Sequence, residues 1–148
     1  MNVTQAVSSV NRLFLDTSPV IYYIEKNAQY FALTDVIFNL IDQGAFTAVT
    51  SPITLAECLI YPYRQGNTKL QKDFTDLIVH GYSTVCVVID EKIGAKAAEL
   101  RAIYNLALPD ALQIACALAA GCDAFLSNDI ALKRISEIPM LILDELTV

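Results

Sequence analysis

The sequence predicts a three-layer α/β/α sandwich around a parallel five-stranded sheet. Five short apolar runs, rich in β-branched residues, alternate with longer segments of helical periodicity. Strands that alternate with helices form parallel sheets covered by helices on both faces. The 148 residues, 55% of them hydrophobic, are enough for one domain with a sizeable core.

The first half of the chain predicts two strands and two helices. RLFL at 12–15 forms the first strand, which ends at Asp16. Proline suits the first turn of a helix, so we expect a helix over 19–25. An apolar stripe predicts a second helix over 28–42. FTAVT at 46–50 is β-branched and predicts the second strand.

Two helices and a third strand come next. Ser51 is a suitable N-cap for a helix over 52–61, which we expect Pro62 to break. The amphipathic pattern of residues 67–80 predicts a further helix. TVCVVI at 84–89 is a continuous apolar run, as expected of a strand covered on both faces.

The last third predicts two more helices and two more strands. Helices are expected over 91–104, after an Asp cap, and over 109–120, opened by proline. DAFLS at 123–127 is the fourth strand, Asp129 starts a short helix, and MLILD at 140–144 is the fifth strand.

Residues 1–11 are expected to be a polar, poorly ordered leader, and residues 12–148 a single domain. Residues 1–11 contain no basic n-region and no apolar h-region, so no signal peptide is expected. No apolar run approaches the roughly 18 residues of a membrane span. We therefore expect a cytoplasmic protein without a membrane partner.

Charge and cysteine content limit the classes of partner. The net charge is −6, which argues against tight non-specific binding to a phosphate backbone. It does not exclude a substrate that meets a bound metal and a local basic patch. Cysteines stand at 58, 86, 116 and 122 without a C-x-x-C pair, so buried free thiols are expected rather than a zinc site.

Four acidic residues stand in apolar or small-residue segments: Asp16, Glu57, Asp110 and Asp129. The three aspartates each have an alternative explanation as helix caps or first-turn carboxylates. Glu57 does not, since its segment ITLAECLIY has no other charge, and we expect this glutamate to be nearly dry and to need a cation or strong donor.

The strand pattern suggests that these acids share one site. Asp16 ends the first strand and Asp129 follows the fourth. If these two strands are neighbours, both acids line the crevice where the strand order reverses. Four carboxylates there could not all stay ionised without compensation. All-oxygen ligands favour Mg²⁺ or Mn²⁺, which activate a water and stabilise a leaving oxygen of a phosphodiester.

Three segments of the chain resemble the PIN-domain family, in particular its VapC-like toxin ribonucleases. These are FLDTSPVIYYIE, SPITLAECL and the block from LPDALQIA to FLSND, and the resemblance runs from about Arg12 to Leu146. It implies the strand order 3-2-1-4-5 and a site in which Asp16, Glu57 and two further aspartates, Asp110 and Asp129, hold Mg²⁺ or Mn²⁺.

The resemblance also implies cleavage of single-stranded RNA, often in a homodimer, often held off by an antitoxin. It places Thr17 or Ser18 beside the first acid, and Ser127 beside the metal water. Basic residues that could steer phosphates, or simply be solvated, are Arg64, Lys69, Lys72, Lys133 and Arg134. Tyrosines 22, 23, 61 and 63 are expected in the core or in a groove wall, with base stacking as the alternative.

Two other functions compete with the nuclease. A PIN scaffold could bind RNA or a protein without cutting, although the four acids argue against that. A Mg²⁺-dependent phosphatase with Asp16 as nucleophile would usually carry a second aspartate where Ser18 stands. The single histidine, His80, is expected to be a helix C-terminal cation, and no serine or cysteine nucleophile has supporting spacing.

Overall fold

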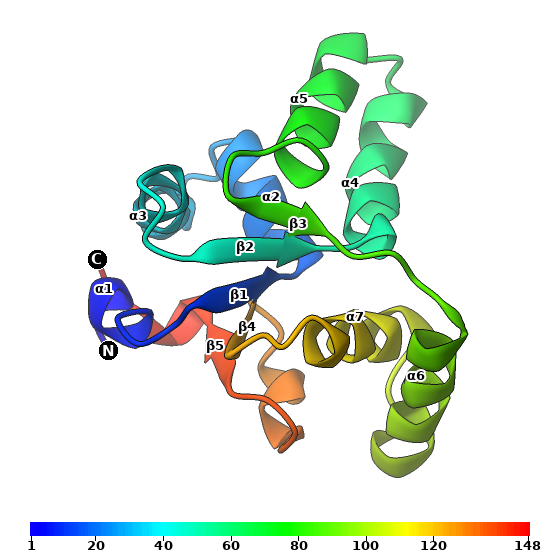
Figure 1. Cartoon of the computed structure of the whole chain (residues 1–148). Helices are drawn as coiled ribbons and strands as arrows, with labels where there is room; N and C mark the ends of the chain where they lie inside the picture. Colours follow the sequence, from blue (N-terminus) through cyan, green and yellow to red (C-terminus); the bar gives the residue numbers. More distant parts are fainter.

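The computed structural model describes all 148 residues and has a central parallel sheet in the order β3-β2-β1-β4-β5 (Figure 1). Its strands are β1 (Arg12–Leu15), β2 (Thr47–Thr50), β3 (Thr84–Cys86), β4 (Ala124–Ser127) and β5 (Met140–Ile142). All four strand pairings are parallel. The predicted fold class and strand order are therefore confirmed.

Helices cover both faces of this sheet. They are α1 (Val3–Ala6), α2 (Thr17–Ile24), α3 (Phe31–Asp42), α4 (Pro52–Arg64), α5 (Thr68–Ile78), α6 (Glu91–Tyr104) and α7 (Leu108–Ala119), with 3-10 turns η1 (Ile130–Arg134) and η2 (Leu143–Glu145). None of these helices combines the length and the apolar character that a membrane span needs.

Two hydrophobic clusters fill the layers because side chains alternate along each strand. Leu13 and Leu15 of β1 point into a cluster formed with α1 to α5. Phe14, between them, points into a second cluster with α6, α7 and η1, where its ring stacks on that of Phe125 at 5.0 Å between centroids. Figure 1 shows α6 and α7 on the opposite side of the sheet from α2 to α5.

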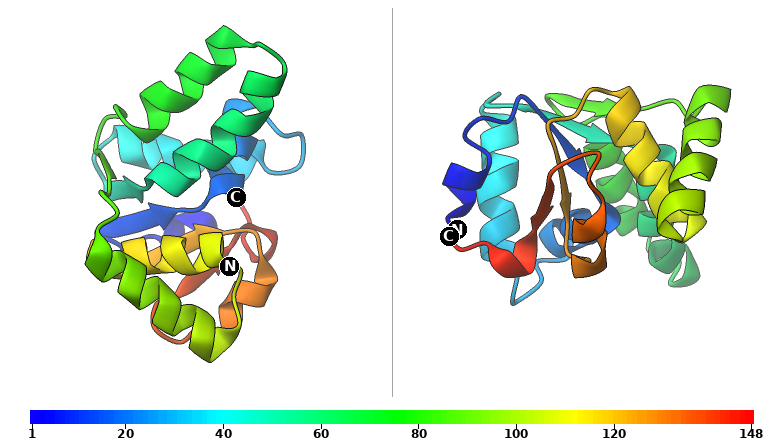
Figure 2. Two further views of the ribbon diagram at one scale, coloured as in Figure 1. Left: turned by 90° about the vertical axis from the view of Figure 1, so that its right-hand side faces the viewer. Right: turned by 90° about the horizontal axis from the view of Figure 1, so that it is seen from below.

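The N-terminal segment is ordered, so the expectation of a poorly ordered leader for residues 1–11 is wrong. Val3 in α1, Val7 at its C-cap and Val10 in the following turn are all buried. The Val3 amide also donates to the Thr147 carbonyl at 2.8 Å. The two chain ends consequently lie side by side (Figure 2, right).

Two further local predictions are corrected. Helix α4 continues through Pro62 to Arg64, because the helix ends soon afterwards and the buried proline ring adds apolar packing. Strand β3 is three residues long and lies at the sheet edge, so its side chains are not covered on both faces. Val85 in β3 is exposed, and Val88, which was predicted to belong to the strand, lies beyond its end and is also exposed.

The four cysteines are free thiols, as predicted. Cys58 and Cys116 are buried, whereas Cys86 and Cys122 are half-buried. His80 lies just beyond the C-terminal end of α5 and is exposed, at the helix end where it was expected.

Candidate active site

The candidate site lies where β1 and β4 end at the carboxyl edge of the sheet. These strands pair with Leu15 opposite Leu126, so the residues that follow them are adjacent. Asp16 caps α2, and its Oδ1 accepts a hydrogen bond from the Thr17 amide at 2.8 Å. Its Oδ2 accepts one from the Ser127 hydroxyl at 2.8 Å. The condition that strands one and four be neighbours is therefore met.

Asp16 is the buried acid of the four, at 8% exposed. Burial raises the pKa of its carboxyl to about 6, against the lowering effect of the hydrogen bonds from Ser127 and Thr17. The charges of Asp110 and Glu57 raise it further. No ion pair of the protein includes Asp16, so its charge is not neutralised by a basic side chain.

Asp110 comes to the site from the first turn of α7. It is half-buried, and its carboxylate accepts no hydrogen bond from the protein. Burial raises the pKa of Asp110, and the charges of Asp129 and Glu57 add to the increase. Asp16 and Asp110 are thus each subject to the charges of other acids of the predicted site.

Glu57 approaches the site from α4, and it is exposed rather than nearly dry as expected. The reason is its position beside the buried stripe of α4, which consists of Thr54, Cys58 and Pro62. Its Oε1 accepts a hydrogen bond from the Thr17 hydroxyl at 2.6 Å. Thr17 thus links Glu57 to the segment that carries Asp16.

Asp129 caps η1, where its Oδ1 accepts from the Ala131 amide at 3.0 Å. Its own amide donates to the Ser127 hydroxyl oxygen at 3.1 Å. The fully buried Ser127 hydroxyl thus bridges the Asp129 backbone amide to the Asp16 carboxylate. Ser18 is half-buried and forms no side-chain hydrogen bond.

A buried amide network supports these elements, and the sequence prediction missed it. Gln113 of α7 accepts a hydrogen bond from the Ser51 hydroxyl and donates to the Thr54 hydroxyl at 2.7 Å. Thr54 in turn donates to the Leu15 carbonyl at 3.3 Å. The network joins α7, the start of α4 and the end of β1. A glutamine alone in the apolar segment ALQIACALAA, where a buried amide needs partners, could have indicated it.

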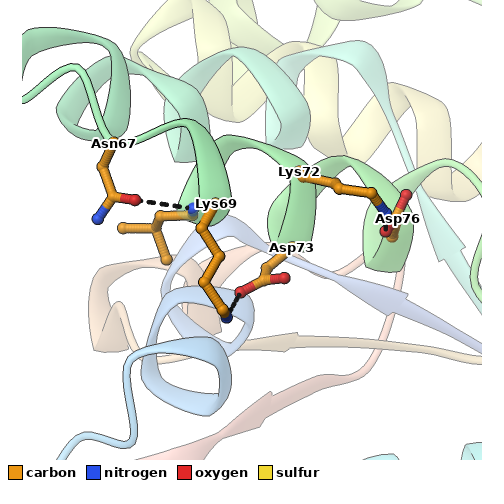
Figure 3. A network of polar contacts seen from close by, with 6 residues as sticks. Asn67, Lys69, Lys72, Asp73 and Asp76 are labelled. Carbon is orange, nitrogen blue, oxygen red and sulfur yellow. Dashed lines mark hydrogen bonds and ion pairs between the residues drawn. The ribbon is translucent and has the colours of Figure 1, made fainter.

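The basic residues proposed for phosphate steering differ in how their charges are balanced. Lys69 pairs with Asp73 at 2.8 Å and Lys72 with Asp76 at 2.5 Å, each one turn along α5 (Figure 3). Lys133 pairs with Glu145 at 2.9 Å, and Arg134 donates to the Tyr104 carbonyl. Arg64 has neither an ion pair nor a side-chain hydrogen bond.

The site is open rather than a closed pocket. The largest cavity, about 480 Å³, lies between α6 and α7 and is not lined by any of the four acids. No three His, Cys, Asp or Glu side chains of the structure form a group that could hold a metal ion. The donor set is nevertheless all oxygen, and no basic side chain forms an ion pair with any of the four acids.

The tyrosines singled out by sequence fall into two groups. Tyr22 and Tyr23 are half-buried, and their rings stack on Tyr30 and Phe38, respectively. Tyr61 and Tyr63 are exposed on α4, at 56% and 65%. Only the first two belong to the core.

Comparisons with solved structures establish the fold. The VapBC2 structure from Rickettsia felis, bound to a promoter DNA fragment, matches with a TM-score of 0.69 at 19% identity, over 88% of this chain and 98% of that one. VapC20 of Mycobacterium tuberculosis, a toxin that cleaves the sarcin-ricin loop, matches with a TM-score of 0.66 at 14% identity, over 86% and 98%. FitAcB of Neisseria gonorrhoeae matches with a TM-score of 0.66 at 15% identity, over 90% of this chain and 99% of that one.

A comparison of the sequence with curated proteins found no match. The family model described as the PIN domain matches residues 13–138, which is most of the chain and includes all four acids. The shared fold and this match confirm the resemblance predicted from the sequence. The chain belongs to the PIN domain family.

Proposed function

We propose that the protein is a metal-dependent endoribonuclease that hydrolyses phosphodiester bonds of single-stranded RNA. The observation that carries the proposal is the Asp16 carboxylate, which is buried at a strand end, lacks a cationic partner and is subject to the charges of Asp110 and Glu57. Two like charges about 5 Å apart repel by roughly 3 kcal/mol at an effective dielectric near 20. Protonation or a counter-charge relieves repulsion of this kind, and a divalent cation would supply the counter-charge.

Asp16, Glu57, Asp110 and Asp129 are the residues that would hold Mg²⁺ or Mn²⁺. A cation bound there would neutralise charge on the phosphodiester and lower the pKa of a water ligand. Ser127 and the Thr17 amide fix both oxygens of Asp16, which leaves further lone pairs on each for a cation. Thr17 holds Glu57 toward the same side.

A second function is favoured by one observation. The side chains as they stand do not form a three-residue metal group, which suits a PIN scaffold that binds RNA or a protein without cutting. The buried charge at Asp16 argues for the nuclease instead, because a purely binding scaffold would gain stability by losing it.

The decisive experiment compares charge-removing variants of equal shape. Asp16→Asn and Asp110→Asn should each abolish cleavage of labelled single-stranded RNA in Mg²⁺ or Mn²⁺, with unchanged circular dichroism. Asp90→Asn is the matched control, since it removes a carboxylate that caps α6 while leaving an equally good cap. Cleavage that survives in the Asp16→Asn protein, or in excess chelator, would contradict the proposal.

We infer further that the protein acts as the toxin of a toxin-antitoxin pair and forms a homodimer. The fold shared with the VapBC and FitAcB structures supports this assignment. Co-expression with the product of the neighbouring reading frame should give a stable complex that no longer cleaves RNA. Light scattering of the purified chain should report twice the 16.2 kDa of one protomer. A monomer, or a neighbour product that neither binds nor inhibits, would contradict this assignment.

A further inference from the structure

One side of α4 continues outward from Glu57 with two more exposed residues. Glu57, Tyr61 and Arg64 stand at i, i+4 and i+7, which places them on one side of a helix. Tyr61 is 56% exposed, and Glu57 and Arg64 are exposed as well. We call these three residues the α4 strip. Along the helix axis Tyr61 is about 6 Å and Arg64 about 10 Å beyond Glu57.

The ring of Tyr61 is anchored but not covered. Its hydroxyl accepts a hydrogen bond from the Gln65 side-chain amide at 2.8 Å, which limits its rotation. Tyr63 on the same helix is 65% exposed and makes no side-chain hydrogen bond. At about 100° per residue, Tyr63 lies about 120° around the helix from Glu57, whereas Tyr61 lies about 40° away.

Arg64 is the one unpaired cation of the α4–α5 hairpin. The hairpin carries two other basic residues, Lys69 and Lys72, and each forms an ion pair with an aspartate of α5 (Figure 3). In a chain of net charge −6, an unpaired arginine in line with the acids is a local site for phosphate.

We propose that single-stranded RNA lies along the α4 strip, with a base next to the scissile phosphate stacked on Tyr61 and a phosphate further along paired with Arg64. This inference rests on the proposed nuclease function and names Tyr61 and Arg64 as positioning residues. Stacking on an aromatic ring tolerates any base, and the arginine fork matches the oxygens of a phosphate. The strip therefore gives the enzyme contact with RNA without requiring a basic surface.

A polypeptide is the competing occupant, because Ile60, 50% exposed, extends the apolar surface beside Tyr61. RNA is favoured because the strip starts at an acid of the candidate active site and ends at a free cation. A peptide bound there would depend on Ile60 as much as on Tyr61, and RNA would not.

The test measures binding separately from cleavage. Fluorescence polarisation of labelled single-stranded poly(A) and poly(U) oligonucleotides, in chelator, reports affinity of the whole chain without hydrolysis. Tyr61→Ala should weaken poly(A) binding about tenfold, and Tyr61→Phe should restore it. Arg64→Ala should weaken both oligonucleotides and reduce the salt slope of log K by about 0.7. In Mg²⁺ or Mn²⁺, Tyr61→Ala should raise KM more than it lowers kcat.

Tyr63→Ala and Lys69→Ala are the matched controls, and both should bind RNA as the wild type does. Equal loss from Tyr61→Ala and Tyr63→Ala would overturn the proposal, as would an Ile60→Ser variant that weakens RNA binding as much as Tyr61→Ala. A chain that binds along the strip but never cuts RNA would contradict the nuclease function and leave the strip supported. If the chain cuts RNA and Tyr61→Ala leaves KM unchanged, the nuclease function is supported and the role of the α4 strip is contradicted.

Discussion

At the residue scale, burial of the charged Asp16 carboxylate lowers the free energy of unfolding, although the proposed metal site needs this carboxylate. Its folded pKa, about 6, lies above the ordinary value of 3.8 because burial disfavours the charged form. Between these two pH values the folded protein holds a proton that the unfolded chain has lost. Stability of the metal-free protein therefore falls as the pH rises through this window, by about 3 kcal/mol in total.

We accordingly expect Asp16→Asn to be more stable than the wild type at pH 7 in chelator, by about 2 kcal/mol. The variant removes the charge and keeps an N-cap of similar shape. Urea unfolding across this pH window measures the difference, which should vanish near pH 4. Asp90→Asn should show no such trend, and an Asp16→Asn protein less stable than the wild type at pH 7 would contradict the explanation.

At the element scale, α4 and α7 are held to β1 by the Gln113 network. Gln113 is 1% exposed, and its amide bonds Ser51 and Thr54 at the start of α4. Asp110 stands one turn earlier on α7, and Glu57 one turn later on α4 than Thr54. The network therefore sets the separation of these two acids.

Gln113→Leu should lower the free energy of unfolding by about 2 kcal/mol, because the Ser51 and Thr54 hydroxyls lose a buried partner. It should also reduce RNA cleavage although Gln113 contacts none of the four acids. Gln71→Leu is a control of the same chemistry on α5, where the amide bonds the Pro62 carbonyl at 3.4 Å. Full activity in Gln113→Leu would show that the network is purely structural.

At the scale of the whole molecule, the four acids come from both layers. Glu57 belongs to α4 over one hydrophobic cluster, and Asp110 belongs to α7 over the other. The charges of both act on Asp16 at the edge of the sheet. A cation held there would join the two layers, so binding would stabilise the whole fold rather than one loop.

Adding Mn²⁺ should therefore raise the melting temperature of the wild-type protein. At one hundred times the dissociation constant, linkage gives about 2.7 kcal/mol, or roughly 5–10 °C for a domain of this size. Asp16→Asn and Asp110→Asn should lose most of this shift, and Asp90→Asn should keep it. An unchanged wild-type melting temperature would favour the non-catalytic scaffold.

The order of residues alone predicted the fold class and singled out the four acids as a candidate site. Strand and helix periodicity is local, so β1, β2 and β4 were predicted within one residue of their observed bounds. The carboxylates after β1 and β4 were visible because Asp16 follows directly on one apolar run and Asp129 lies two residues beyond the end of another.

The burial and the hydrogen-bond or ion-pair partners of each side chain could not be predicted in this way, because they depend on which elements pack together. Packing left Glu57 exposed and made Asp16 the buried acid, the opposite of what the composition of ITLAECLIY indicated. It placed β3 at an edge and folded Val3, Val7 and Val10 into the core. It also paired Lys69 and Lys72 within α5 and left Arg64 free, since ion pairing depends on side-chain neighbours that the order of residues alone does not specify.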